Sequence, residues 1–140
     1  MDEVEDCTQV AKYIKRTYPH IKILVRARDR QHVYRLREAG VEHIWRDTYL
    51  SALGMSYEAL VSLGIESKKA FDGIELFREH DESLLRRQQT IYKDEQQLIE
   101  SSRAAMVELE SLFDSDMRTA RKMDIESGDV NIKHGLNDQH

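Results

Sequence analysis

Arginines are the residues of this sequence whose number and spacing best suit a chemical role. Five of them fall within twelve residues, beginning inside an aliphatic run and continuing into a more polar stretch. Guanidinium groups bind carboxylates and phosphates through paired hydrogen bonds, so the cluster suits recognition of an anion. A solvated helix face paired with Asp29 and Glu38 is the alternative, and the pattern alone leaves it open. The cluster consists of Arg26, Arg28, Arg30, Arg35 and Arg37.

Arg46 and Asp47 form a second candidate site. They follow a short apolar run and precede a stretch with helical periodicity. In open α/β sheets, the carboxyl ends of the strands face the ligand crevice, so a charged pair at this corner could meet a ligand. Arg46 would then bind a carboxylate through two parallel hydrogen bonds. The alternative is a local ion pair at the start of the helix.

Metal and nucleophilic chemistry lack the residue patterns that they need. The six histidines form no HExxH pattern, and the single cysteine, Cys7, excludes a disulfide framework and a Cys₄ or Cys₂His₂ zinc site. No GxSxG elbow is present, and the six glycines make no GxGxxG turn for a dinucleotide. We therefore expect no catalytic residue, no metal and no glycine-rich cofactor turn in this chain.

The segments that must position these arginines alternate between helical and strand-like patterns. Apolar residues at helical spacing predict a helix over 7–18, which Pro19 ends. The β-branched run 21–27 predicts a strand buried on both faces in its middle, and 41–45 predicts a second strand. Short connections of this kind predict an α/β fold with parallel strands and crossover helices. Two strands alone make a poor independent sheet.

Capping residues mark the two helices that follow these strands. Asp29 can cap the first helix, and Gly40 stands where a left-handed C-terminal turn is expected. Thr48 can cap the next helix, and Gly64 can end it. The composition changes directly after this point, so we place a boundary near residues 64–66.

The second region differs in charge and in periodicity. Residues 1–66 carry ten Lys/Arg and ten Asp/Glu, whereas residues 67–140 carry 11 and 16 and hold the whole net charge of −5. This acidity argues against nucleic-acid binding and against docking on anionic lipid. Two apolar columns that repeat every seven residues between Leu84 and Phe113 predict one long helix. No apolar run reaches the roughly 18 residues that a membrane span needs.

Several motifs together resemble one protein family. They are Tyr18-Pro19-His20, the run from Arg26 to Val41, Arg46-Asp47-Thr48-Tyr49, and Ala52-Leu53. The combination closely resembles the C-terminal cytoplasmic regulatory domain (RCK/KTN, TrkA-N-like) of Kef-type glutathione-regulated potassium-efflux antiporters. The resemblance is strong over residues 5–66 and weaker to about residue 112.

This resemblance implies that the chain begins after the fourth strand of a Rossmann-like regulatory domain. The glycine-rich half and the transmembrane antiporter would lie upstream. It implies no cofactor within this chain and leaves room for a nucleotide, AMP or NAD, in the full-length domain. Domains of this family form homodimers through the helical extension. Glutathione at the dimer interface keeps the antiporter closed, and glutathione conjugates open it.

The resemblance also assigns two site residues. Arg46 matches the family arginine that contacts glutathione, and Asp81 stands where the best-known members have an asparagine that contacts it. Arg46 and Asp81 are thus expected to bind a glutathione-like anion. An aspartate accepts hydrogen bonds but cannot donate an amide N–H, and its charge would repel the carboxylates of the ligand.

The expected organisation is the C-terminal half of a Rossmann-like domain over 1–66, a long helical dimerisation extension over 67–123, and a disordered tail over 124–140. The expected function is non-catalytic: a ligand-gated regulatory fragment of a potassium/proton antiporter at the cytoplasmic face of the bacterial inner membrane. Its expected partners are a second copy and the parent's transmembrane domain, with no nucleic acid. The alternatives are a fragment of a nicotinamide-dependent oxidoreductase and a stand-alone adaptor that acts through its acidic helix.

Overall fold

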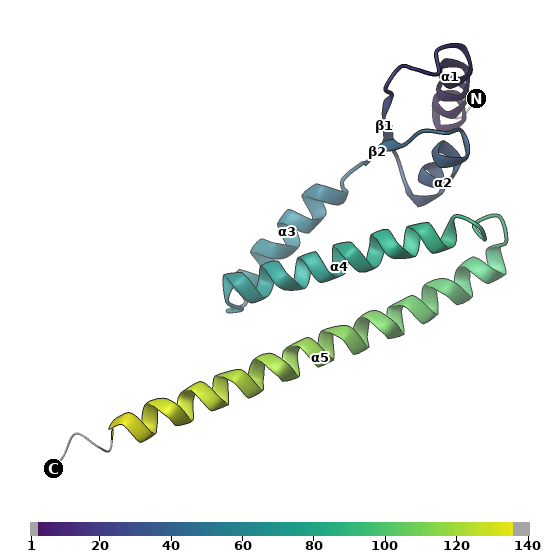
Figure 1. Cartoon of the computed structure of the whole chain (residues 1–140). Coiled ribbons are helices and arrows are strands. Elements are labelled where there is room, and N and C mark those ends of the chain that lie inside the picture. The colour runs from purple at the N-terminus through teal and green to yellow at the C-terminus, as the bar shows by residue number, and fades with distance from the viewer. Residues whose placement is uncertain (1–2, 136–140) are drawn as a thin grey trace. The chain divides into compact units, whose positions relative to one another are not determined.

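The computed structural model describes residues 3–135, and the side chains of residues 3–116. Helices and strands alternate at first and give way to two longer helices (Figure 1). The order helix, strand, helix, strand, helix agrees with the prediction. The elements are α1 (Glu3–Thr17), β1 (Leu24–Ala27), α2 (Arg30–Glu38), β2 (His43–Arg46), α3 (Tyr49–Ser62), α4 (Ser67–Gln88) and α5 (Glu95–Gly135).

The sheet consists of β1 and β2, which pair in parallel with α2 as their crossover. The register places Leu24 opposite His43 and Ala27 opposite Arg46, so both strands end at the same edge. Both strands are shorter than predicted. The prediction that the middle of the first strand is buried on both faces is wrong, because Val25 is half-buried and Arg26 is exposed. This alternation is typical of a sheet that is covered on one face.

Local capping fixes α2 between the two strands. The Asp29 carboxylate accepts a hydrogen bond of 2.8 Å from the backbone N–H of His32, which confirms Asp29 as the N-cap. At the other end, Gly40 has a φ of +86°, and the Val41 N–H donates to the Leu36 carbonyl at 3.0 Å. The left-handed turn at Gly40 is therefore confirmed, and it returns the chain to the sheet.

The hydrophobic core is small and lies around α2. Val33, Tyr34 and Leu36 from α2 are almost fully buried, together with Ala27 from β1. The remaining buried core residues come from α1, the segment before β2, α4 and the α4–α5 connection: Ala11, Val41, Leu85 and Tyr92. Helix α4 thus contributes to the same core as the sheet, although the sequence places it in a separate region.

The predicted single long helix is wrong in one respect, because it divides into α4 and α5. Asp94 caps α5: its carboxylate accepts from the backbone N–H of Gln97 at 3.1 Å and from the Gln97 side-chain amide at 2.9 Å. These bonds lower the pKa of Asp94. Tyr92, which the sequence places in a heptad column, lies in the connection, and its ring stacks on Tyr34 of α2 at 4.9 Å between centroids.

Among the described residues, 3–99 form one compact unit and 100–135 another. The boundary expected near residues 64–66 coincides with the turn between α3 and α4, inside the first unit. Of the predicted disordered tail, residues 124–135 continue α5 as helix, and 136–140 lie outside the described residues. Within the described part of the chain, none of the helices combines the length and the apolar character needed to cross a membrane.

Candidate functional site

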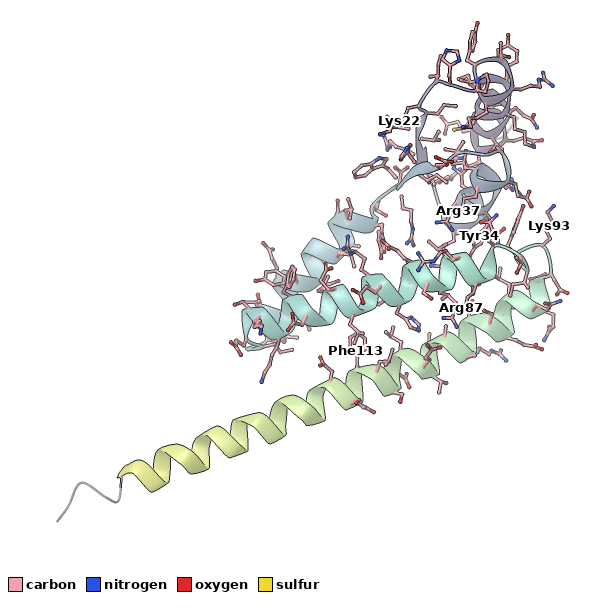
Figure 2. The ribbon with its side chains drawn as sticks, viewed as in Figure 1. Lys22, Tyr34, Arg37, Arg87, Lys93 and Phe113 are labelled. Atoms are coloured by element: carbon pink, nitrogen blue, oxygen red, sulfur yellow. The ribbon has the colours of Figure 1, made fainter. Side chains whose placement is uncertain are left out.

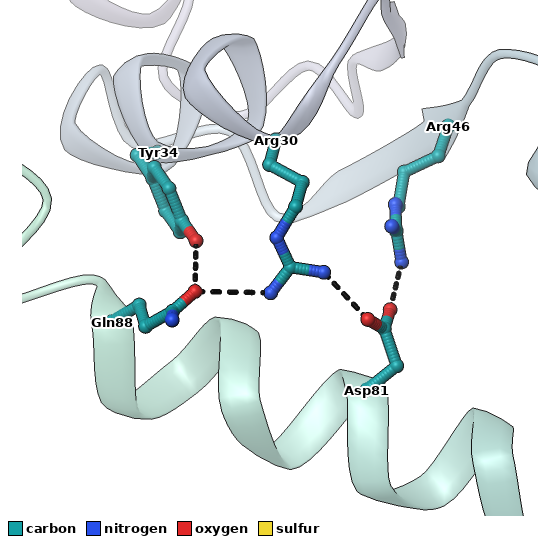
Figure 3. Close-up of polar contacts among 5 residues, drawn as sticks. All are labelled: Arg30, Tyr34, Arg46, Asp81 and Gln88. Carbon is teal, nitrogen blue, oxygen red and sulfur yellow. Dashed lines mark hydrogen bonds and ion pairs between the residues drawn. The ribbon is translucent and has the colours of Figure 1, made fainter. Parts of the chain in front are cut away.

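Arg46 and Asp81, the two residues assigned to an anion site, form an ion pair with each other. Arg46 is the last residue of β2, and its Nη1 donates to the Asp81 carboxylate on α4 at 2.5 Å (Figure 3). The backbone N–H of Asp47 donates to the carbonyl of Ala27 at 2.8 Å. This bond continues the strand pairing to the edge of the sheet and so fixes the position from which Arg46 extends.

A second arginine holds the other oxygen of the same carboxylate. Arg30 Nη1 donates to Asp81 at 2.5 Å, and Arg30 Nη2 donates to the side-chain oxygen of Gln88 at 3.1 Å. The Tyr34 hydroxyl donates to that same Gln88 oxygen at 2.8 Å (Figure 3). Asp81 is only 8 % exposed and Gln88 only 1 %. Two cations compensate the buried charge, since an unpaired buried carboxylate would be strongly unfavourable.

Helical spacing explains how these contacts form. Arg30 and Tyr34 lie four residues apart on α2, and Asp81 and Gln88 lie seven apart on α4, so each pair shares one helix face. The two faces meet, and the contacts join residues that are 51 to 58 positions apart in the sequence. Sequence reasoning missed Gln88 and Tyr34. The available signal was the seven-residue spacing of Asp81 and Gln88, with the buried Leu85 between them.

The arginine cluster is divided between several roles. Arg30 belongs to the Asp81 network, and Arg37 lines a nearby cavity. Arg26 donates from its Nε to Asp47 at 2.8 Å, so Asp47 pairs with the first strand rather than with its neighbour Arg46. Arg28 and Arg35 are exposed. The structure therefore brings together only part of the predicted cluster.

A cavity of about 240 Å³ opens beside Arg46. Three guanidinium groups and one carboxylate line it, so its charge is net positive, and its remaining walls are apolar or aromatic. The lining residues are Arg37, Arg46, Arg78, Glu82, Val33, Ile44, Trp45, Tyr49, Leu50 and Leu85. Such a cavity suits an anion that also carries an apolar group, because the arginines can bind the charge and the walls can cover the rest.

Tyr49 and Arg78 both line this cavity, and Arg78 Nη2 also donates to Glu75 at 3.0 Å. The Tyr49 hydroxyl and the Arg78 Nε are buried and have no hydrogen-bond partner within the described part of the chain. Buried polar atoms are normally paired, so two unpaired atoms on residues of the same lining distinguish this cavity. The Tyr49 ring also supports Arg46, whose guanidinium lies 3.9 Å from the ring centroid. Burial, followed by the charge of Asp81, raises the pKa of Tyr49.

Thr48, between Arg46 and this tyrosine, departs from its expected role. It occupies the N-cap of α3, but its side chain makes no capping bond and its φ is +61°. A β-branched residue rarely adopts this left-handed conformation, which costs about 1–3 kcal/mol. The strained turn lies next to the cavity, where it directs Tyr49 beneath Arg46. Among the described residues, no group of histidine, cysteine and carboxylate side chains could hold a metal ion.

Two comparisons with known proteins identify the family. Residues 51–129 match the family model described as the potassium efflux system KefB C-terminal domain. One similar solved structure is titled "Shewanella denitrificans Kef CTD in AMP bound form". It matches with a TM-score of 0.61 and 32 % sequence identity over 65 % of this chain. The matched part is 58 % of that structure, so this chain spans little more than half of its length.

Proposed function

Because the chain belongs to the family of potassium efflux system KefB C-terminal domains, we propose that it is an effector-binding part of a potassium/proton antiporter. A regulatory domain of this kind performs no chemistry. It gates transport by binding an effector more tightly in one domain arrangement than in another. The transmembrane domain of the parent protein responds to that arrangement, and the regulatory domain lies at the cytoplasmic face of the bacterial inner membrane.

The effector site is the cavity beside Arg46. The observation that carries this proposal is a cavity that three arginines line together with Trp45, Tyr49 and Leu50. Glutathione offers two carboxylates, and its thioether conjugates add an apolar group. Arginines suit the carboxylates, and Trp45 and Leu50 suit the apolar group.

Asp81 holds Arg46 in place instead of contacting the effector itself. A guanidinium group has five N–H donors, and the bond to Asp81 uses one of them. The Asp81 charge is shared between Arg46 and Arg30, which reduces its repulsion of an incoming carboxylate. A ligand carboxylate can therefore approach Arg46 from the cavity side, with Arg37 and Arg78 nearby.

Calorimetry on the full-length parent protein tests this site. Glutathione and a bulky glutathione conjugate are titrated into the wild type and the Arg46→Ala variant. Loss of a hydrogen bond between charged groups should weaken binding about 10- to 100-fold. Arg86→Ala removes an exposed arginine from α4, outside the cavity, and is the matched control. Equal affinities for the wild type and Arg46→Ala would refute the site.

The domain acts as a homodimer, and α3 supplies part of the contact surface. This helix has no buried residue, although Leu50, Met55 and Val61 are large and apolar. An apolar helix that is exposed on most of its surface normally meets a partner. Sedimentation equilibrium should show a dimer that Met55→Glu weakens and that Gln31→Glu, on an exposed position of α2, does not. A wild-type monomer at high concentration would contradict the dimer.

The parent domain binds a nucleotide. The related Shewanella structure is AMP-bound, and this chain matches 58 % of it. The glycines of this chain form no phosphate-binding turn.

A further inference from the structure

A strongly basic segment lies between Asp6 and Asp29. It contains six Lys or Arg residues and no Asp or Glu, in a chain whose net charge is −5. Charge counts over whole regions conceal this segment, because acidic residues on either side balance it. Arg26 near its end is paired with Asp47, so the part of interest is residues 12–22.

The structure gathers this charge at one end of the small sheet. Lys12, Lys15 and Arg16 share one face of α1, at a spacing of three and four residues. Lys22 lies in the segment that leads into β1 (Figure 2), and His43 begins β2. This is the amino end of both strands, opposite to the carboxyl edge at which Arg46 lies.

A hollow of about 370 Å³ lies within this surface. Its lining includes Lys15, His20, Lys22 and His43, and Glu42 is the one carboxylate of that lining. We call the side chains of Lys12, Lys15, Arg16, His20, Lys22 and His43 the basic surface. The helix C-terminus accounts for only part of this charge: Lys15 and Arg16 complement the dipole of α1, whereas Lys22 is outside the helix.

Exposed aromatic and aliphatic side chains accompany the basic surface. Tyr13 is 56 % exposed, Tyr18 47 % and Ile21 44 %. Tyrosine favours the headgroup level of a bilayer, where its ring is partly buried and its hydroxyl stays hydrated. Basic residues next to such side chains are the pattern of a surface that binds anionic lipid.

We propose that the basic surface binds the headgroups of an anionic lipid bilayer. The hollow admits a lipid phosphate between Lys15 and Lys22, and Tyr18 and Ile21 enter the headgroup layer. The choice of a bilayer over another polyanion rests on the proposed function, which places the parent protein in a membrane. The charge count over whole regions argued against lipid docking, but that count conceals a segment with no Asp or Glu between Asp6 and Asp29.

Vesicle co-sedimentation with the 140-residue chain tests the inference. Vesicles of phosphatidylglycerol mixed with phosphatidylcholine should bind the protein, and pure phosphatidylcholine vesicles should not. The double variant Arg16→Gln/Lys22→Gln should bind about 10- to 30-fold more weakly, from the usual contribution of a basic residue near an anionic surface. The control Lys68→Gln/Arg103→Gln removes the same charge from exposed positions elsewhere and should bind like the wild type.

Four results would overturn the inference. The first is equal binding to both kinds of vesicle, and the second is equal loss in the double variant and its control. The third is tighter binding of a short DNA duplex, lost in the same double variant, which would indicate a nucleic-acid surface. Displacement of the protein by inorganic phosphate at matched ionic strength would also refute a bilayer contact and indicate a small phosphate ligand. Glutathione calorimetry on the parent protein is independent of all these outcomes, so failure of one proposal leaves the other testable.

Discussion

Helices α2 and α3 each follow a strand of the same two-stranded sheet, but they bury very different amounts of surface. Helix α2 is rich in charged residues, yet His32, Val33, Tyr34 and Leu36 are buried among its nine residues. Helix α3 is far more apolar, and none of its 14 residues is buried. The difference shows that composition alone does not decide burial. The apolar side chains of α2 are buried by contacts within the chain, whereas α3 presents an apolar surface that suits a partner.

Paired truncations in the two helices should give the largest difference. Leu36→Ala in α2 removes a fully buried side chain and leaves a cavity, so it should lower the free energy of unfolding by about 2–5 kcal/mol. Met55→Ala in α3 alters a side chain that is 70 % exposed. It should change the free energy of unfolding by about 0.5 kcal/mol or less. Urea denaturation at low protein concentration measures both. Similar losses in the two variants would contradict the contrast between the helices.

The Asp81 network pairs the charge of Arg30, which lets α2 pack against α4. Removal of Asp81 should have the next largest effect on the free energy of unfolding. Asp81→Ala leaves Arg30 and Arg46 without their shared carboxylate. Loss of one partner from a buried pair costs about 3–5 kcal/mol. The Arg30 side chain is 33 % exposed, however, so water can solvate it and we expect about 1–3 kcal/mol. Glu79→Ala, at an exposed position of α4, is the control, and equal effects would refute the network's role.

The contrast between the helices also marks the limit of what the sequence could predict. Caps depend on neighbouring residues, so Asp29 and Gly40 were predictable. The break before α5 was predictable in principle, because Asp94 and Gln97 have the spacing of a capping pair, but the heptad columns obscured it. The heptad pattern also misplaced Tyr92, which packs on α2 across 58 residues of sequence.

The site shows the same limit more clearly. Spacing and resemblance identified Arg46 and Asp81 separately, but neither indicated that they bind each other across 35 residues. Arg30 and Gln88 became part of the network through the packing of α2 on α4, which no local pattern specifies. The cavity beside Arg46 depends on the same packing, so its lining could not be read from the sequence.

High pH should weaken the α2 side of the molecule through Tyr92. Burial first, and then the hydrogen bond to Glu38, raises the pKa of Tyr92 to about 12 from 10.0. Its folded form therefore keeps the proton that the unfolded form loses above pH 10.0. The contribution of protonated Tyr92 to the stability of the folded state is therefore complete below pH 10.0. It is lost as the pH rises to about 12.

Tyrosinate absorbance against pH measures this titration. Subtraction of the Tyr92→Phe curve from the wild-type curve isolates Tyr92 from the other five tyrosines. A late step near pH 12 is expected. A difference curve centred at pH 10.0 would show that Tyr92 is not held against α2.

The last comparison concerns two of the left-handed residues at the boundaries of α2 and α3, Gly40 and Thr48. Gly40→Ala after α2 places a side chain at a φ of +86°, which should cost about 1–2 kcal/mol even though the new Cβ makes only an ordinary contact with Lys15. Thr48→Gly before α3 should have the opposite sign. It removes the cost of a β-branched residue at a φ of +61° and sacrifices no capping bond.

Glycine also gains freedom in the unfolded chain, which offsets about 0.5–1 kcal/mol of that benefit. The net stabilisation by Thr48→Gly is then about 0–2.5 kcal/mol, and paired thermal melts of both variants should resolve its sign. If Thr48→Gly instead destabilises the protein as much as Gly40→Ala does, the turn before α3 is not strained. In the expected case, α2 ends in a turn suited to its residue, whereas α3 begins in one that is strained and directs Tyr49 under Arg46. Such strain persists where a site requires a particular geometry.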